Sequence, residues 1–269
     1  MKKILLASLL AMTAQFAAAE TKPATIDPEF AKIEAMVKAK DMKGAYQALN
    51  TLAATGNAQA IYNLGYLTQT GQGAAKDEKK AIQLYEQAAA KGYPVANYVL
   101  GKNYVTGTLG LKQDIAKAKQ HLERASSSGF DDATIDYAVL LFSENKPASD
   151  KLALSKLDPL IKKSNYPAIH AKALYDISTG FKAKNEKPIQ QGLNSIQDLA
   201  KKGYIPALMA VGNMFANGNI IPQNLTEAKK IFSALAQENV PQAKESLATV
   251  DKLIAEQAKA PKAASAKKS

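Results

Sequence analysis

Apolar and small residues recur along this chain at a fixed interval of 36 to 37 residues. The clearest unit runs from Asn57 to Pro94, and the same order of residue types returns between Ala96 and Gly129. Within each unit the apolar positions are three or four residues apart, which is the spacing of an amphipathic helix. A glycine-bearing turn separates two such runs, so each unit is predicted to be a helix, a turn and a second helix.

Residues that end the second helix extend this repeat over most of the chain. They are Gly56, Gly92, Gly129, Asn165, Gly203 and Asn239, at intervals of 36, 37, 36, 38 and 36 residues. Glycine and asparagine are the residues that most readily adopt the left-handed backbone conformation that closes a helix. We therefore predict that each of the six ends a helix.

Two further positions predict how the helices pack. Four residues after each closing residue lies a mostly small side chain, and eight residues after it lies a mostly apolar one. The first set is Ala60, Ala96, Ala133, Ile169, Ala207 and Ala243, and the second is Leu64, Leu100, Tyr137, Ala173 and Val211. A single pair of helices cannot bury its own apolar face, so the pairs are expected to stack into a solenoid.

Turns and helix starts follow the same period. First helices are expected to end at Gly71, Gly107, Gly180 and Gly218, with Glu144 at this position in the most aberrant unit. Second helices are expected to begin after the capping residues Asp77, Asp114, Asp150 and Asn224, with Glu227 as the capping-box partner of Asn224, and at Lys187-Pro188 in the fourth unit.

Helical spacing also precedes and follows the repeats. Terminal helices are predicted from Ile26 to Lys40 and from Pro241 to about Ala258, and the second should cap the stack because it has no partner helix. The expected fold is therefore all-α: an α/α superhelical solenoid of about five helix-turn-helix repeats with terminal capping helices, over residues 26–258. Residues 259–269 are Ala, Lys, Ser and Pro without apolar spacing, which predicts a disordered basic tail.

Residues 1–19 have the three parts of a secretory signal peptide. Lys2 and Lys3 precede an apolar run of about 13 residues, and Ala17 to Ala19 offer a small-residue cleavage site. An uncleaved membrane anchor is the alternative, but a spanning helix needs about 20 apolar residues. We expect cleavage before Glu20, a linker at residues 20–25, and a periplasmic or secreted protein without membrane insertion after cleavage.

The composition of the chain excludes several kinds of chemical site. The chain has no cysteine and two histidines, which excludes disulfides, thiol nucleophiles and cysteine-ligated metals. Of the formal net charge of +11, two lysines lie in the signal segment and four in the tail, which leaves about +5 for the folded part. This excess either attracts anionic envelope components or keeps the surface soluble. Without an aromatic–basic motif, no nucleic acid partner is expected.

No arrangement of residues indicates catalysis. His121 and His170 lie 49 residues apart on different predicted helices, and neither belongs to a metal-binding motif. Asp132 and Asp136 have the spacing of an acid–base pair on one helical face, but a solvated helix start is the simpler explanation. A nucleophile elbow and a phosphate-binding glycine-rich loop are both missing. The sequence therefore predicts no catalytic, cofactor-binding or metal-binding residue.

The repeat pattern of residues 57–92 is specific in combination. It reads Ala-x-x-x-Leu-Gly, a Gly-x-Gly turn, then Asp-x-x-Lys-Ala-x-x-x-Tyr-x-x-Ala-Ala-x-x-Gly. This pattern resembles the Sel1-like repeat, a 36-residue relative of the tetratricopeptide repeat, and the resemblance covers about Ala45 to Leu247. It implies an α-solenoid that acts as an adaptor or receptor for other proteins. Exported bacterial members are similar in being periplasmic or secreted interaction proteins, and some are immunity proteins against envelope-targeting toxins. A cysteine-rich branch is linked to β-lactam binding, which this cysteine-free chain gives no ground to expect.

In tetratricopeptide-like stacks the first helix of each unit lines the concave face. The polar and aromatic residues expected there are Tyr62, Tyr66, Gln69, Tyr98, Lys102, Tyr175 and Asn213. Tyrosine suits a binding groove because it offers a large apolar area with a polar tip. The alternative is that these tyrosines pack between neighbouring first helices, and Tyr104 is expected to be structural.

The resulting hypothesis is a non-catalytic periplasmic module that binds a protein segment in its concave groove. It would serve as an envelope scaffold, a regulator, or an immunity protein against an envelope-targeting toxin. The alternative is a binder of cell-wall glycan or peptidoglycan fragments, or an envelope hydrolase of β-lactam or peptidoglycan type. The identity of the partner and the oligomeric state are open at this point.

Overall fold

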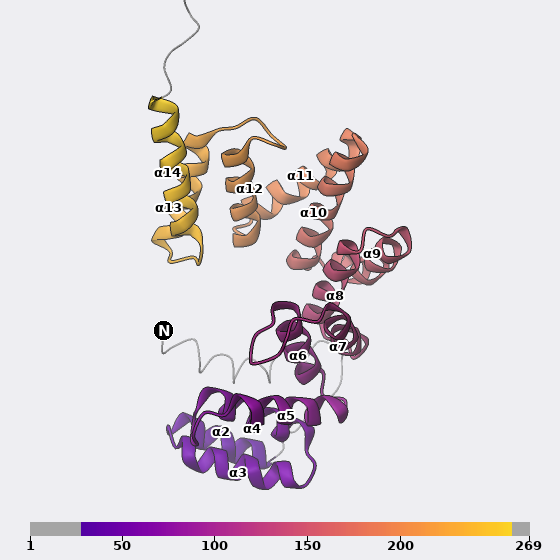
Figure 1. Cartoon of the computed structure of the whole chain (residues 1–269), viewed down its shortest axis with the longest axis vertical. Helices are drawn as coiled ribbons and strands as arrows, with labels where there is room; N and C mark the ends of the chain where they lie inside the picture. The colour runs from indigo at the N-terminus through magenta and orange to yellow at the C-terminus, as the bar shows by residue number, and fades with distance from the viewer. Residues whose placement is uncertain (1–27, 260–269) are drawn as a thin grey trace, which may run out of the picture. The chain divides into compact units, whose positions relative to one another are not determined.

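The computed structural model describes residues 28–259, all of whose regular secondary structure is helical. Thirteen helices follow one another in this range (Figure 1). They are α2 (Pro28–Lys38), α3 (Met42–Ala54), α4 (Ala58–Thr70), α5 (Glu78–Ala90), α6 (Pro94–Thr106), α7 (Ile115–Ser127), α8 (Asp131–Ser143), α9 (Pro147–Lys162), α10 (Tyr166–Ala183), α11 (Glu186–Lys201), α12 (Ile205–Asn217), α13 (Leu225–Gln237) and α14 (Ala243–Lys259). The predicted signal peptide, linker and all but the first residue of the predicted tail lie outside the described residues.

The chain forms two compact units, which meet in sequence at His121 and Leu122, within α7. In the first unit each helix from α2 to α6 packs against the next one along the chain. The predicted small and apolar positions are buried here, with Ala60, Ala96 and Leu100 each exposing 0 % of their surface and Leu64 exposing 3 %. The helix-turn-helix prediction is thus confirmed for these repeats.

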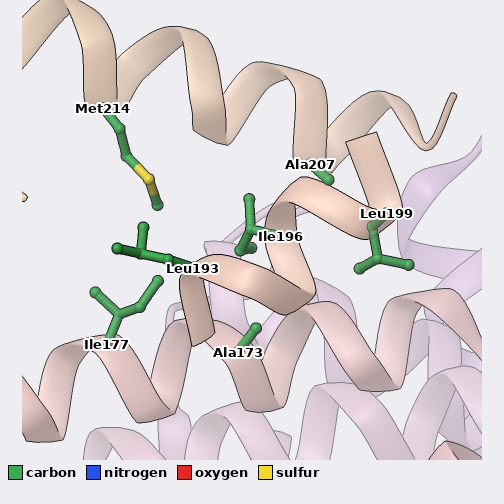
Figure 2. Packing of buried hydrophobic residues seen from close by; sticks show 7 residues of the cluster. All are labelled: Ala173, Ile177, Leu193, Ile196, Leu199, Ala207 and Met214. Carbon is green, nitrogen blue, oxygen red and sulfur yellow. The ribbon is translucent and has the colours of Figure 1, made fainter. Parts of the chain in front are cut away.

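The second unit continues the pattern, and its helices also contact the helix two positions further on. The helix α8 packs against α9 and α10, and α12 packs against α13 and α14. Figure 2 shows the centre of one core cluster, in which Leu193 of α11 lies between Ile177 of α10 and Met214 of α12, and Ile196 of α11 lies between Ala173 and Ala207. Ile196 is completely buried, so three successive helices share one apolar layer.

The last helix caps the unit as predicted. It begins at Ala243, two residues after the expected start, and packs on α13 with weaker contact to α12. Its Val250 exposes 1 % and joins the cluster of Phe232 and Leu225. The helix therefore covers the apolar side that α13 would otherwise expose.

The prediction that Asn165 closes a helix in the left-handed conformation is wrong by one residue. Ser164 has the positive φ of 57°, whereas Asn165 has φ −68° and its side chain accepts a hydrogen bond from the amide of Ala168. Asn165 is thus the N-cap of α10, as Asn57 is of α4. Asparagine suits both roles, and only the backbone geometry separates them. All positions counted from Asn165 therefore shift by one.

Substitutions at the adjacent residues Ser164 and Asn165 are expected to change the stability of the protein in opposite directions. Ser164→Gly should stabilise the protein by about 1 kcal/mol, because glycine adopts a positive φ without steric cost. Asn165→Ala should destabilise it by about 1 kcal/mol through loss of the cap, while Asn165→Asp should be nearly neutral. Urea unfolding curves of these three variants and of Asn165→Gly provide the test. Stabilisation by Asn165→Gly with no gain from Ser164→Gly would restore the original assignment.

Gly180 does not end a first helix, contrary to the prediction. It lies inside α10, which continues to Ala183 and closes at Lys184 with φ 52°. A Cβ at Gly180 would lie 2.8 Å from the carbonyl oxygen of Asn185, so this glycine permits a close approach of the following turn. A glycine in a turn and one in a close contact look identical in sequence.

The predicted starts of the second helices are correct where the capping side chain binds an amide three residues on. They are wrong for α9 and α11. Asp77, Asp114 and Asn224 accept hydrogen bonds from the amides three residues on, as predicted. Asp150 instead lies within α9, whose N-cap is Lys146, and Asn185 rather than Lys187-Pro188 caps α11. The amide of Asn224 donates to the carbonyl of Phe215, so Glu227 does not complete a capping box.

Candidate functional site

Tyr62, a predicted groove residue, lies in the core of the first unit. It exposes 3 % of its surface, and its ring lies 5.3 Å from the rings of both Tyr85 and Tyr93. Burial raises the pKa of Tyr62 well above its usual value, so the phenol stays neutral. A partner has no access to this ring, which removes Tyr62 from the candidate surface.

Of the other predicted groove residues in the first unit, one supports the core and three lie at the surface. The Gln69 side chain accepts a hydrogen bond of 2.6 Å from the Tyr85 hydroxyl, which gives it a structural role. Tyr66 and Tyr98 are half-buried, and the exposed Lys102 ammonium lies 5.9 Å from the centre of the Tyr98 ring. Tyr66, Tyr98 and Lys102 therefore remain available on this unit.

Tyr175 and Asn213 belong to the second unit. Because the repeat here is counted from Asn165 as the N-cap, the position of Tyr175 within the repeat changes by one. Counted from the N-caps, Tyr175 is the counterpart of Leu67, and Leu174 is the counterpart of Tyr66. Leu174 exposes 42 % of its surface although it is a large apolar residue. Sequence reasoning missed Leu174 because the misplaced Asn165 moved it by one position.

An apolar pocket of about 380 Å³ lies between α10 and α12. Its lining includes Leu174, Pro206, Met209, Asn213, Met214 and Ile220. Met214 also belongs to the core cluster shown in Figure 2, so the floor of the pocket is fixed by packed side chains. Asn213 is exposed and supplies a polar amide at the edge of this apolar lining.

A second pocket, of about 450 Å³, lies between α8 and α10, and we call it the Asp150 pocket. Its lining includes Val139, Phe142, Asp150, Leu174, Tyr175 and Lys182. The rings of Phe142 and Tyr175 are stacked, with centroids 4.1 Å apart and planes at 20°. Burial raises the pKa of Tyr175, and the charge of Asp150 and the hydrogen bond with its carboxylate add to this effect.

Leu174 lines both pockets, and we name the surface of Val139, Phe142, Leu174, Tyr175, Met209 and Asn213 the Leu174 face. Val139 exposes 47 % and Ile220, at the edge of the apolar pocket, exposes 37 %. No charged residue occurs between Gly203 and Thr226, a stretch that includes all of α12. Exposed apolar side chains beside pockets, with few charges, are typical of the centre of a protein interface.

The first unit holds a larger hollow of about 680 Å³ that has a different character. It is lined by Tyr46, Thr68, Asp77 and Lys80, together with the loop before α5. Burial by itself would raise the pKa of Tyr46, but hydrogen bonds with Thr68 and Lys80 lower it below its usual value. This hollow is polar and carries both charges, and it does not contain the predicted groove residues.

Each of the two histidine rings is held by contacts with a neighbouring tyrosine ring. The Nδ1 of His121 lies 3.0 Å from the Asn97 amide oxygen, and its ring stacks on the buried Tyr104 at 5.7 Å. Burial lowers the pKa of His170, whose ring meets that of Tyr204 edge to face.

Between residues 28 and 259, His, Asp and Glu side chains form no group of three or more suited to hold a metal ion. Within the same range, no helix combines the length and apolarity that a membrane crossing requires.

Comparison with known proteins identifies the repeats. The model of the Sel1 repeat family matches residues 58–93, 94–130 and 205–240. The intervening residues hold α8 to α11, where the helices are longer and the register shifts. Chitin synthase regulatory factor 3 of Schizosaccharomyces pombe is 30 % identical over 89 residues, which are 33 % of this chain and 10 % of that protein. The chain thus spans about a tenth of the length of this curated relative.

Solved structures share the fold. The Sel1 repeat protein from Oxalobacter formigenes superposes with a TM-score of 0.63 at 23 % identity, over 84 % of this chain and 88 % of that one. The protective antigen c5321 of uropathogenic Escherichia coli has a TM-score of 0.58 at 19 % identity, over 78 % of this chain and 44 % of that one. At these identities the likeness concerns the fold. The chain therefore contains three Sel1 repeats and has the all-helical solenoid fold that the Sel1 repeat protein from Oxalobacter formigenes shares.

Proposed function

We propose that this chain is an exported, non-catalytic interaction protein that binds a segment of another protein on its Leu174 face. The observation that carries this proposal is the exposed Leu174 between two pockets in the second unit. Binding energy at interfaces is concentrated in a few side chains that fill such pockets. The pockets, of about 380 and 450 Å³, have the size for single large side chains of a bound segment.

The face has the properties of a preformed binding surface. Met214 and Leu174 project from helices that share one packed core layer, so the pockets exist before a partner arrives. A rigid surface loses little conformational entropy on binding. The proposed role is that of an envelope scaffold, a regulator or an immunity protein, since each requires recognition of an exposed segment. Export to the periplasm is part of the proposal and rests on the signal-like residues 1–19.

Affinity capture from periplasmic and cytoplasmic fractions tests this proposal. A protein retained by the parent chain from the periplasm should be lost with Leu174→Asp, because a carboxylate would be placed between two apolar surfaces. The matched control is Leu152→Asp, since Leu152 is a leucine of similar exposure, 38 %, on the second helix α9. The captured protein, once purified, should bind Leu174→Asp at least tenfold more weakly than it binds Leu152→Asp.

Two results would contradict the proposal. Equal affinity of the captured protein for the two variants would move the interface away from the Leu174 face. Recovery of cell-wall fragments that remain bound near 1 M salt would favour the glycan-binding alternative, because charge attraction is screened within about 3 Å at that ionic strength.

A further inference from the structure

One oxygen of Asp150 is buried without a hydrogen-bond partner. Its Oδ1 atom has no hydrogen-bond partner, and the Asp150 carboxylate contributes to the raised pKa of Tyr175. A buried polar atom without a partner is costly, and such atoms are rare in folded proteins. Asp150 lines the Asp150 pocket, so a ligand in the pocket has access to this residue. Rotation about χ2, which is broad for aspartate, exchanges the two oxygens.

Asp150 is the one carboxylate among the residues that line this pocket. Lys182 is the nearby cation that also lines the pocket, and its ammonium donates a hydrogen bond of 2.6 Å to Asn145. Charge complementarity therefore favours a cationic group beside Asp150.

The stacked rings of Phe142 and Tyr175 strengthen this preference. Their centroids are 4.1 Å apart, and both rings line the same pocket as Asp150. A guanidinium or ammonium group is attracted to an aromatic face, and a guanidinium can pair with a carboxylate at the same time. The raised pKa of Tyr175 keeps its phenol neutral and able to donate to the carboxylate.

The other side of Leu174 has the opposite character. The apolar pocket is formed with α12, and no residue from Gly203 to Thr226 is charged. Met209 and Ile220 offer apolar contacts beside the floor at Met214, and the unbranched Met209 can adapt to varied side chains. A charged side chain would lose its hydration here without gaining a partner.

We infer that the Leu174 face recognises a protein segment in which a lysine or arginine lies close to large apolar side chains. The basic side chain enters the Asp150 pocket, and an apolar side chain enters the pocket between α10 and α12. This inference rests on the proposed function and adds the chemistry of the partner. Leu174 separates the two pockets and contacts both side chains of the segment.

Selection of random twelve-residue peptides displayed on phage, with the purified chain as bait, tests the inference. Recovered peptides should be enriched in lysine or arginine together with leucine, methionine or phenylalanine. In a synthetic peptide of the recovered sequence, replacement of the basic residue by glutamine should weaken binding at least tenfold. The same replacement should change binding less than twofold with Asp150→Asn, because the two changes remove one shared interaction.

Controls separate this interaction from general charge effects. Asp158→Asn removes a carboxylate of the same helix that is exposed and paired with Lys162, and it should leave the tenfold effect intact. Leu174→Asp should reduce the affinity for the parent peptide at least tenfold, while Leu152→Asp should not. Circular dichroism of each variant checks that the helical fold is retained.

Several results would overturn the inference. Selection of acidic or uncharged peptides would exclude a basic side chain as the recognised group. An equal effect of the glutamine replacement on the parent and on Asp150→Asn would exclude Asp150 as its partner. If such peptides still require Leu174, the proposed function survives and only the charge preference fails. If no peptide distinguishes the parent from Leu174→Asp, both the inference and the proposed function fail.

Discussion

Phe232→Ala is expected to lower the free energy of unfolding of the second unit by about 3–5 kcal/mol. Phe232 exposes 1 % of its surface and fills the space between α12, α13 and α14, with Ala216, Leu225 and Val250 around it. Removal of the ring leaves a cavity that the surrounding helices fill only in part. Urea unfolding, with hydrogen exchange to report on α12 and α13, measures the loss. Phe181→Ala is the control, since Phe181 is 58 % exposed and its removal should change stability by about 0.5 kcal/mol or less.

The contact between Phe232 and Gly212 allows a sharper test. A Cβ at Gly212 would lie 2.7 Å from the Phe232 ring, so Gly212→Ala alone should destabilise the unit by about 1–3 kcal/mol. In the Phe232→Ala background the ring is gone, and Gly212→Ala should become neutral or stabilising because alanine favours helix by about 1 kcal/mol over glycine. Additive effects of the two substitutions would show that the ring and the glycine are not in contact.

Gly192→Ala is expected to destabilise the second unit by about 1–3 kcal/mol, although helix propensity alone predicts the opposite. Gly192 lies inside α11 and is buried. A Cβ there would lie 2.5 Å from the carbonyl oxygen of Ala173 and 2.7 Å from the Cγ1 of Ile177. The first neighbour is backbone and cannot rotate away, so α10 and α11 would have to separate.

Thermal or urea unfolding of Gly192→Ala measures this cost, and the matched control is Gln191→Ala. Gln191 is the exposed neighbour on the same helix, and its substitution should be neutral or slightly stabilising. Gly192→Ala and Gln191→Ala with equal, small effects would mean that α10 and α11 are further apart than the structure has them.

Much of the fold is predictable because its signals are local. Asp77, Asp114 and Asn224 cap helices through bonds to amides three residues away, so the chain near each residue contains the whole interaction. The buried Ala60, Ala96 and Ala207 follow a spacing that any stacked pair of helices requires. The errors at Asn165 and Gly180 occur where one residue type serves two local roles.

The candidate site is less predictable, because exposure depends on neighbours that are distant in sequence. Tyr62 was expected in a groove, but Tyr85 and Tyr93 cover its ring. Leu174 was not expected there, and an exposed leucine has no signature in the sequence. Tyr175 and Asn213 were predicted, and they line different pockets that share Leu174.

Periodic apolar spacing and local capping specify the repeat, the helical class and most helix ends, and both are readable from the sequence. The side chains that remain on the surface, and the pockets that they form, depend on how the helices pack. Burial is a property of packed helices: Ala173 of α10 meets Gly192 of α11, and Met214 of α12 meets Leu193 of α11 (Figure 2), only after the three helices have assembled. The same assembly leaves Leu174 and Val139 exposed beside the pocket between α8 and α10.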